Sequence, residues 1–355
     1  MDESQQLTSQ SLIAMCAILN STTATGVTQS PGLPAKPEDW DVIYNQAVQT
    51  FGILENTWQL WQNASTNEYA IVIQGTQSNF ESIVEDLVFP LVQFSLSLGG
   101  TQVLSLPRAG DNSKAAGVHA GFLYGSLVML KDMVVQITDI IPAASTVYIT
   151  GHSMGAGVAT ITTNLLDQLQ LQDLLPNNIN WQTIVFAQPK AGNSSFADEM
   201  NYYFANSGKF YNFTQNLDWV PKAPLSFETV YDWPEPNPND EESQALQKYL
   251  PDLESFLKFL ERKAESLVNA INTDIAKSLN NYLKTIPKFL GFQFSGSLEI
   301  IPSLAFETSG TSITLLGTPG TNPQDPNDFM WQHHASNYYQ LISAYFDLPT
   351  NFQGG

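Results

Sequence analysis

A serine between two glycines at fixed spacing is the feature of this sequence best suited to covalent chemistry. Gly151-His152-Ser153-Met154-Gly155 has the form G-x-S-x-G, in which the serine stands on a sharp turn between a strand and a helix. Residues 146–150 are β-branched and aromatic, as in a buried strand, and residues 156–170 carry apolar side chains at helical spacing. The pattern therefore predicts a strand–turn–helix that presents Ser153 as a nucleophile.

A serine hydroxyl needs a histidine base to become nucleophilic at neutral pH. The chain has four histidines: His119, His152, His333 and His334. In hydrolases built around such a turn, the acid and then the histidine follow the serine along the chain, so His119 is excluded. The backbone position of His152 points its ring away from Ser153. In the remaining pair, on a loop before a predicted helix, we expect His334 to be the base, with His333 as the alternative.

The histidine in turn needs a carboxylate that fixes its tautomer. Asp218 follows a predicted core strand at residues 210–214, and loops at strand ends carry catalytic groups. Asp198 lies in a predicted surface helix, and Asp232, Asp240 and Asp252 lie in a predicted insertion. Asp218 is therefore the expected acid.

Acyl transfer also needs N–H donors aimed at the developing oxyanion. One is expected from the backbone of Met154, directly after the nucleophile, and the other from Thr76, after the predicted strand 70–73. Thr76 offers both an N–H and a hydroxyl.

The elements around these residues alternate between strands and helices, which predicts a mainly parallel α/β sheet. Residues 58–61 and 69–74 read as a hairpin, 121–141 as a helix, and 184–187 and 210–214 as further core strands. Residues 1–56 are expected to be helices around a loop at 26–37. Strands return at 292–316, with a hairpin turn at Ser309-Gly310. We therefore expect a catalytic domain at 1–225 and 291–355, interrupted by a helical insertion at 226–290.

The chain is acidic because bases are scarce: 34 Asp and Glu stand against 14 Lys and Arg, a net charge of −20. This composition disfavours binding to nucleic acid or to strongly anionic lipid. Cys16 is the single cysteine and is expected to be a buried apolar residue, and no cluster has metal-ligand spacing, so no metal or cofactor is expected. No basic leader or membrane-length apolar run is present, so we expect a soluble protein, cytoplasmic or secreted; the compartment and the oligomeric state are left open.

Assembled in order, these blocks resemble the class 3 lipase family. The similar segments are 73–76 (I-Q-G-T), 85–87 (E-D-L), 118–122 (V-H-A-G-F), 151–155 (G-H-S-M-G), 186–193 (F-A-Q-P-K-A-G-N), 218–221 (D-W-V-P), and His334 with Tyr338. The resemblance covers residues 58–225 and 330–346 and implies the α/β-hydrolase fold. Gln74 stands where the family has arginine, and the paired cysteines of the secreted fungal members are absent.

The resemblance further implies a lid, here residues 77–97, whose apolar side chains include Phe80, Val84, Leu87 and Val88. Glu85 and Asp86 interrupt the apolar run, as an amphipathic movable helix requires; the alternative is a core helix. The insertion at 226–290 either caps the acyl pocket or adds a helical layer elsewhere.

The expected function is hydrolysis of acylglycerol esters at a lipid interface through an acyl-enzyme on Ser153. Phospholipase A1 activity is the alternative within the family. A non-catalytic, lipase-like scaffold is a third possibility, against which the intact set of Ser153, Asp218 and His334 argues.

Overall fold

The computed structural model of the chain describes residues 1–23, 32–46, 49–51, 54–75, 91–98, 101–106, 108, 116–224, 294–301, 305–322, 325–326, 328 and 330–353. A seven-stranded central sheet organises them, with the strand order β1-β4-β5-β9-β10-β12-β15. These strands are β1 (Trp40–Asn45), β4 (Trp58–Asn63), β5 (Tyr69–Ile73), β9 (Thr146–His152), β10 (Asn180–Phe186), β12 (Phe210–Gln215) and β15 (Thr311–Leu315).

The five strands from β5 to β15 run parallel, and only β1 and β4 run antiparallel to their neighbours. The predicted mainly parallel α/β sheet is therefore confirmed, as is the hairpin, which is β4 and β5. The parallel order brings the ends of β9 and β12 to the same edge of the sheet, where Ser153 and Asp218 follow them.

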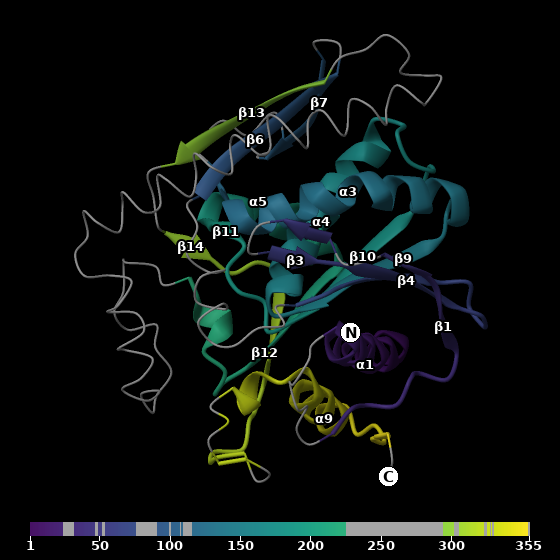
Figure 1. Cartoon of the computed structure of the whole chain (residues 1–355), viewed down its shortest axis with the longest axis vertical. Coiled ribbons are helices and arrows are strands. Elements are labelled where there is room, and N and C mark those ends of the chain that lie inside the picture. Colours follow the sequence, from purple (N-terminus) through teal and green to yellow (C-terminus); the bar gives the residue numbers. More distant parts are fainter. Residues whose placement is uncertain are drawn as a thin grey trace.

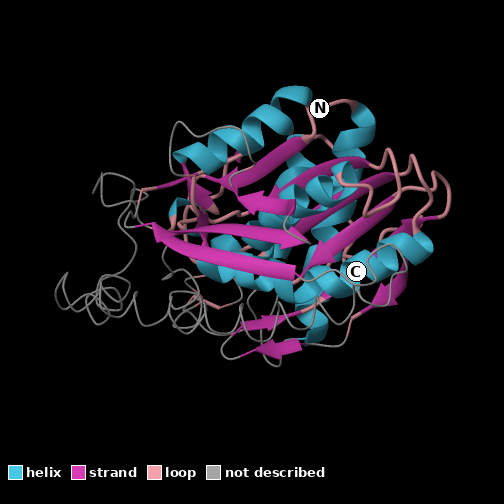
Figure 2. Ribbon diagram, turned by 90° about the horizontal axis from the view of Figure 1, so that it is seen from above, coloured by secondary structure: helices cyan, strands magenta, loops and turns pink. Residues whose placement is uncertain are grey.

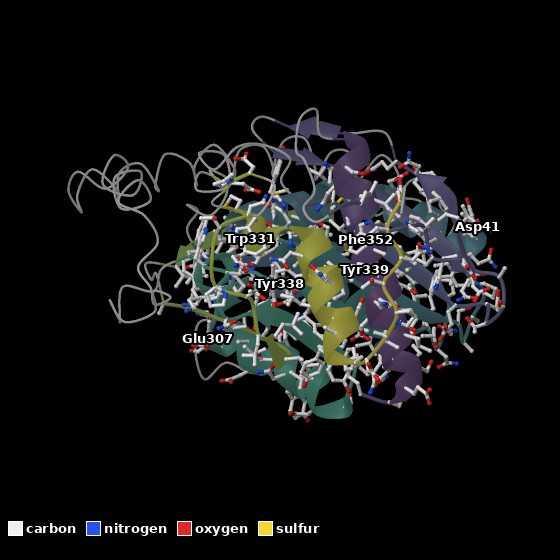
Figure 3. All side chains as sticks on the ribbon, turned by 90° about the horizontal axis from the view of Figure 1, so that it is seen from below. Asp41, Glu307, Trp331, Tyr338, Tyr339 and Phe352 are labelled. Carbon is white, nitrogen blue, oxygen red and sulfur yellow. The ribbon has the colours of Figure 1, made fainter. Side chains whose placement is uncertain are left out.

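Both faces of the sheet are buried, as parallel sheets require. Along β5, Ile71 and Ile73 belong to one core, whereas Ala70 and Val72 belong to the other, because successive side chains of a strand point to opposite faces. The first core contains α3 (Ala120–Ile140), α4 (Met154–Leu171) and α5 (Ser194–Tyr203); the second contains α1 (Glu3–Thr23) and α9 (Ala335–Tyr345). Figures 1 and 3 show α1 and α9 side by side on their face of the sheet, and Figure 2 shows helices flanking the strands.

A second, antiparallel sheet packs beyond α3 and α4 (Figure 1). Its order is β13-β6-β8-β11-β14, with β7 also paired to β6. The strands are β6 (Leu91–Leu98), β7 (Thr101–Leu106), β8 (Val118–His119), β11 (Gly192–Asn193), β13 (Phe294–Ile301) and β14 (Phe306–Glu307).

This second sheet corrects two expectations. Residues 91–97 of the predicted lid helix form β6, whose residues 92, 94 and 96 are buried while 93, 95 and 97 are partly exposed, a period of two that the sequence displays. Ser309-Gly310 is not a hairpin turn: it links β14 of the second sheet to β15 of the first. Gly310 has φ +91°, a conformation that favours glycine, and this turn changes sheets instead of reversing the chain.

The N-terminal part differs from the expected helices in one further respect. Residues 3–23 do form the helix α1, with Cys16 buried as expected, but Trp40–Asn45 is the edge strand β1. A two-stranded hairpin, β2 (Gln49–Phe51) with β3 (Leu54–Asn56), follows it. Pairing with β4 decides the conformation of β1, and that pairing is invisible to local pattern.

The proposed insertion at 226–290 lies outside the described residues, so the division into domains remains a prediction. Within the described residues, no single helix combines the length and apolar character needed to span a membrane, whereas one bent pair of segments, Ala120–Leu130 and Asp132–Ile140 at 48°, meets these criteria together.

Candidate active site

Ser153 stands on a strained turn between β9 and α4. Its backbone angles are φ 62° and ψ −131°, a combination that a residue with a side chain rarely adopts and that costs about 1–3 kcal/mol. The Ser153 N–H donates to the carbonyl of Phe186 on the neighbouring strand at 3.0 Å. The predicted strand–turn–helix is confirmed, and the turn lifts the hydroxyl clear of the sheet edge.

The glycines of the motif are required by close packing around this turn. A Cβ on Gly151 would lie 2.3 Å from the backbone of Gly155, and a Cβ on Gly155 would lie 2.4 Å from the carbonyl oxygen of Ile73. Both distances are below any that real Cβ atoms show. Strand β9, helix α4 and the end of β5 can approach this closely only with glycine at both positions.

A continuous chain of hydrogen bonds joins Ser153, His333 and Asp218. His333 Nε2 lies 2.7 Å from Ser153 Oγ, and His333 Nδ1 lies 2.8 Å from Asp218 Oδ2. An ionised carboxylate can only accept hydrogen bonds, so the imidazole proton belongs on Nδ1 and Nε2 accepts from the serine hydroxyl. All three side chains are buried.

The prediction that His334 is the base is wrong. The alternative, His333, is the histidine that lies within hydrogen-bond distance of both Ser153 and Asp218. Trp331–His333 forms a 3₁₀ turn, and His334 is the residue that precedes α9. One step along this turn directs the His334 ring away from Ser153, and its Nε2 lies 3.3 Å from Asp328 Oδ2. The spacing H-x-x-x-Y favoured His334 because it pairs this histidine with Tyr338. In the structure Tyr338, on α9, donates to Asp218, and the histidine that contacts Ser153 is His333.

Asp218 is held by three donors. Its Oδ2 accepts from His333 Nδ1 and from the Tyr338 hydroxyl at 2.8 Å, and its Oδ1 accepts from the Val220 N–H at 3.0 Å. The Tyr338 hydroxyl accepts in turn from the Gln215 N–H at 3.0 Å, which leaves its own proton for Asp218. Burial first, and then the charge of Asp218, raise the pKa of Tyr338 well above its usual value. Tyr338 therefore remains a donor to Asp218 at alkaline pH.

The ring of His152 packs against the ring of the base, His333. Its ring lies 4.7 Å from the His333 ring, centroid to centroid, and 5.6 Å from that of Tyr338. Burial, and then the neighbouring His333, hold the pKa of His152 well below its usual value. A neutral ring at this place packs against His333 without adding a second positive charge when the imidazolium forms.

Of the two predicted oxyanion donors, Met154 and Thr76, only Met154 lies within the described residues. Met154 is the first residue of α4, and N–H groups of a first helical turn have no partner within the helix, which is the property an anion site needs. Thr76 and the lid residues Phe80, Val84, Leu87 and Val88 lie outside the described residues. Gly75, directly before Thr76, packs against the nucleophile turn.

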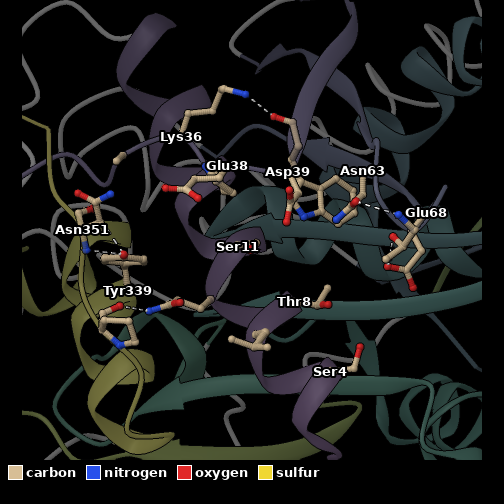
Figure 4. A pocket seen from close by; sticks show the side chains of 17 residues that line it. Ser4, Thr8, Ser11, Lys36, Glu38, Asp39, Asn63, Glu68, Tyr339 and Asn351 are labelled. Carbon is tan, nitrogen blue, oxygen red and sulfur yellow. Dashed lines mark hydrogen bonds between the residues drawn. The ribbon is translucent and has the colours of Figure 1, made fainter.

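A pocket of about 460 Å³ lies apart from these residues, between α1, the segment 35–40, the β4–β5 hairpin and the C-terminal residues (Figure 4). Its lining includes neither Ser153 nor His333, and it is rich in hydroxyl, amide and carboxylate groups such as Thr8, Glu68 and Asn351. This lining is a poor match for an acyl chain, which requires apolar contact. Among the described residues no group of three or more metal-binding side chains occurs.

Comparisons with known proteins find one matching family and several similar solved structures. The family profile of Lipase (class 3) matches residues 70–228. The solved structure of M37 lipase is 18% identical and covers 98% of this chain and 96% of its own, with a TM-score of 0.54. The triacylglyceride lipase of Rhizomucor miehei is 18% identical (63% of this chain, 76% of that chain, TM-score 0.43), and the mono- and diacylglycerol lipase of Aspergillus oryzae is 17% identical (62% and 74%, TM-score 0.45). Over residues 70–228 the chain is similar to the class 3 lipase family, and its structure has the α/β-hydrolase fold.

Proposed function

We propose that the protein hydrolyses carboxylic esters of acylglycerols through an acyl-enzyme on Ser153. The observation that carries this proposal is the unbroken chain from Ser153 Oγ through His333 to Asp218, with distances of 2.7 and 2.8 Å. The family match at residues 70–228 supports a lipid ester as the substrate.

In the first half of the reaction, Ser153 Oγ attacks the ester carbonyl while its proton passes to His333 Nε2. The resulting imidazolium is stabilised by Asp218, which remains ionised. The tetrahedral intermediate collapses when the ester C–O bond breaks, and His333 returns the proton to the leaving alcohol oxygen. Ser153 is then acylated.

Water completes the cycle. His333 Nε2 takes a proton from the water as its oxygen attacks the acyl carbonyl, and the bond to Ser153 Oγ breaks with return of that proton to the serine. The products are a carboxylic acid and the free enzyme. In both halves we assign the oxyanion to the N–H of Met154 and to Thr76, because Met154 directly follows Ser153 and Thr76 directly follows Gly75, which packs against the nucleophile turn.

The lid stays a proposal for residues 77–90, whose Phe80, Val84, Leu87 and Val88 would cover Ser153 in water and contact a lipid surface on opening. Burying such side chains contributes about 1.5–3 kcal/mol each, which can bias an equilibrium between closed and open forms. Residues 226–290 are proposed as an insertion in a catalytic domain formed by 1–225 and 291–355.

The test compares wild type, Ser153→Ala and the surface control Ser65→Ala on p-nitrophenyl butyrate. Ser65 is exposed and lies on the β4–β5 turn, so its loss should leave the rate unchanged. Ser153→Ala should lower kcat by a factor of about 10⁴–10⁶. More than about a tenth of the wild-type rate in Ser153→Ala would contradict the assignment, given that expected loss.

The substrate class is tested separately with emulsions of tributyrin and triolein and with vesicles of phosphatidylcholine. Faster release of fatty acid from the two acylglycerols supports the proposal. Faster release from the sn-1 position of phosphatidylcholine would reassign the enzyme to phospholipids.

A further inference from the structure

The side chain of Gln215 joins the strand that leads to the acid to the turn that carries the base. Gln215 is the last residue of β12, it precedes Asp218 on the following loop, and it is only 2% exposed. Its Nε2 donates to the backbone carbonyl of Gln332 at 2.6 Å. Gln332 directly precedes His333, so this bond connects two segments that are 117 positions apart in the chain and that carry the two residues of the acid–base pair.

The orientation of the Gln215 amide follows from this partner. A carbonyl oxygen can only accept, so the NH₂ end of the amide faces Gln332 and its Oε1 faces the other way. There Oε1 lies against Gly317, on the loop after β15, and it has no hydrogen-bond partner among the described residues. An unpaired buried acceptor costs stability, so packing alone does not account for an amide at this position. What the amide contributes is the bond that it donates to Gln332.

That bond acts on a peptide unit directly attached to the base. The Gln332 carbonyl and the His333 N–H belong to one planar unit. Its N–H end donates to the Met330 carbonyl at 2.8 Å, and its carbonyl end accepts from Gln215. On the other side of His333, the next N–H along the chain donates to the Trp331 carbonyl at 3.2 Å. Both peptide units that flank the Cα of His333 are therefore held, and the place of the ring then depends on its two side-chain torsions.

Gln215 attaches this turn to the central sheet. Two other side-chain bonds of the turn reach the loop after β15 instead: Gln332 Nε2 donates to the Thr318 carbonyl, and Trp331 Nε1 donates to the Gly320 carbonyl. Both of these bonds are exposed, where water competes for the same groups, whereas the bond from Gln215 is partly buried. The Gln215 bond therefore ties the turn to a rigid element.

The position of the His333 ring matters because it contacts both reaction partners. Its Nε2 lies 2.7 Å from Ser153 Oγ and its Nδ1 lies 2.8 Å from Asp218 Oδ2. A base must be within hydrogen-bond reach of the proton that it takes, and a displacement of about 1 Å can cost a factor of about 10² in rate.

We propose that Gln215 is a positioning residue for the base, whose side-chain donor fixes the peptide before His333 relative to strand β12 and hence to Asp218. The inference rests on the proposed function and deepens it by adding a residue outside the triad. Gln215 does not touch the reacting atoms, and it acts through His333.

The test uses Gln215→Met, which keeps the length of the side chain but removes the donor, and leaves the backbone N–H that bonds Tyr338. The control is Gln168→Met. Gln168 is also buried and its Nε2 also donates to a backbone carbonyl, that of Ser105 at 2.9 Å, but it lies about 20 Å along α4 from the nucleophile turn. Soluble p-nitrophenyl esters give kcat and KM, active-site titration gives the functional fraction, and thermal melting gives Tm. Gln215→Met should lower kcat by about 10–100-fold at nearly constant KM, whereas Gln168→Met should leave kcat unchanged even if Tm falls.

A double-variant cycle separates a positioning role from a structural one. In a His333→Ala background, Gln215→Met should cause no further loss of the residual rate, because a residue that acts through the base then has nothing to act on. An equal loss with and without His333 would show that Gln215 supports the fold instead of the base, and would overturn the proposal.

A second variant displaces the same amide from another element. A Cβ on Gly317 would lie 2.1 Å from Gln215 Oε1 and 2.8 Å from its Cδ, so Gly317→Ala must move the flexible end of this side chain. Gly317→Ala should lower kcat as Gln215→Met does, and should have no effect once Gln215→Ala has removed the side chain. Unchanged kcat in both Gln215→Met and Gly317→Ala would overturn the proposal. If Ser153→Ala is inactive while Gln215→Met matches wild type, the role of Gln215 alone is wrong; if Ser153→Ala stays active, the proposed function itself fails.

Discussion

The hydroxyl of Tyr338 donates to Asp218 Oδ2 at 2.8 Å, the same oxygen that accepts from His333 Nδ1. Helix α9 therefore contributes to the site in two ways: the base lies two residues before its first residue, Ala335, and its first turn supplies the donor to the acid that orients this base. The Gln215 N–H fixes the direction of the tyrosine hydroxyl from strand β12. A displacement of α9 would move base and acid together.

Replacing Tyr338 by Phe should lower kcat/KM by about three- to thirtyfold with little change in fold, because a hydrogen bond to a charged group contributes about 1.5–3 kcal/mol and two other donors to Asp218 remain. The pKa of Tyr338 is raised, so the wild-type hydroxyl keeps its proton through alkaline pH. The ratio of wild-type to mutant kcat/KM should then stay constant from about pH 8 to pH 11, whereas a tyrosine with the ordinary pKa of about 10 would be largely ionised at pH 11. A ratio that falls toward one within that range would show that the hydroxyl loses its proton earlier.

The two adjacent histidines should differ sharply on substitution. His333→Ala removes the group that contacts both Ser153 and Asp218, and should lower kcat by a factor of about 10⁴–10⁶. His334→Ala loses the contact with Asp328, which lies outside the hydrogen-bond chain from Ser153 to Asp218, and should lower kcat by less than about tenfold. Steady-state kinetics on a soluble ester decides this, and an inactive His334→Ala beside an active His333→Ala would contradict the assignment of the base.

Asp218→Asn should keep the fold and reduce kcat by about 10³–10⁴, because an amide at this place favours the wrong imidazole tautomer. The double variant Asp218→Asn/Ser153→Ala should be no less active than Ser153→Ala alone, because the residues act as one unit. Additive losses in the double variant would mean that Asp218 acts independently of the serine.

Two glycines of the motif region offer a matched pair of alanine substitutions. A Cβ on Gly157 would lie 2.6 Å from ring atoms of Phe122, inside the core, so Gly157→Ala should lower the free energy of unfolding by about 1–3 kcal/mol while kcat of the folded enzyme is retained. A Cβ on Gly155 would instead meet the carbonyl oxygens of Ile73 and Gln74 at 2.4 and 2.7 Å. Gly155→Ala should therefore impair kcat as well as stability. Denaturant unfolding with active-site titration separates the two, and equal kcat in both variants would argue against this distinction.

Cys16 should report on unfolding of α1. Burial raises the pKa of its thiol to about 12, from 9.0 for a free thiol, so the thiolate that reacts with iodoacetamide is scarce in the folded protein. Labelling of native protein should be about 10³-fold slower than that of unfolded protein at pH 7, which is the ratio of the two thiolate fractions, and both rates should rise with pH. Because the pKa is raised on folding, thiol ionisation lowers stability only above about pH 9. Rapid stoichiometric labelling of native protein would show that α1 detaches readily.

Local pattern was sufficient for the nucleophile turn, because strand, turn and helix are each encoded within a few residues of Ser153. It was also sufficient for Asp218, which lies on the loop three residues beyond the core strand β12. It failed at His333 because a one-residue difference on a 3₁₀ turn decides which ring faces Ser153, and both residues satisfy the same order rule.

Other features depended on pairing between distant segments. The expected lid helix extends over residues 91–97, but these residues form strand β6, because they pair with β13, which lies about two hundred residues away in the chain. The hydrogen bond from the Gly75 N–H to Asn20 Oδ1 was equally invisible, because an asparagine near the end of a helix carries no signal of a contact 55 residues away in the chain.

The base, His333, lies in the C-terminal part of the chain after residue 293, and this part contacts the preceding part through several strands and one helix. Strand β13 pairs with β6 over eight residues, β14 pairs with β11, β15 pairs with β12, and α9 packs on α1. Ser153 and Asp218 both precede residue 225, whereas His333 follows residue 293. A peptide bond cut between those positions would sever the triad covalently but leave these contacts intact. The two fragments should therefore remain associated as a nicked enzyme, and should be able to reassemble an active site from separately produced halves.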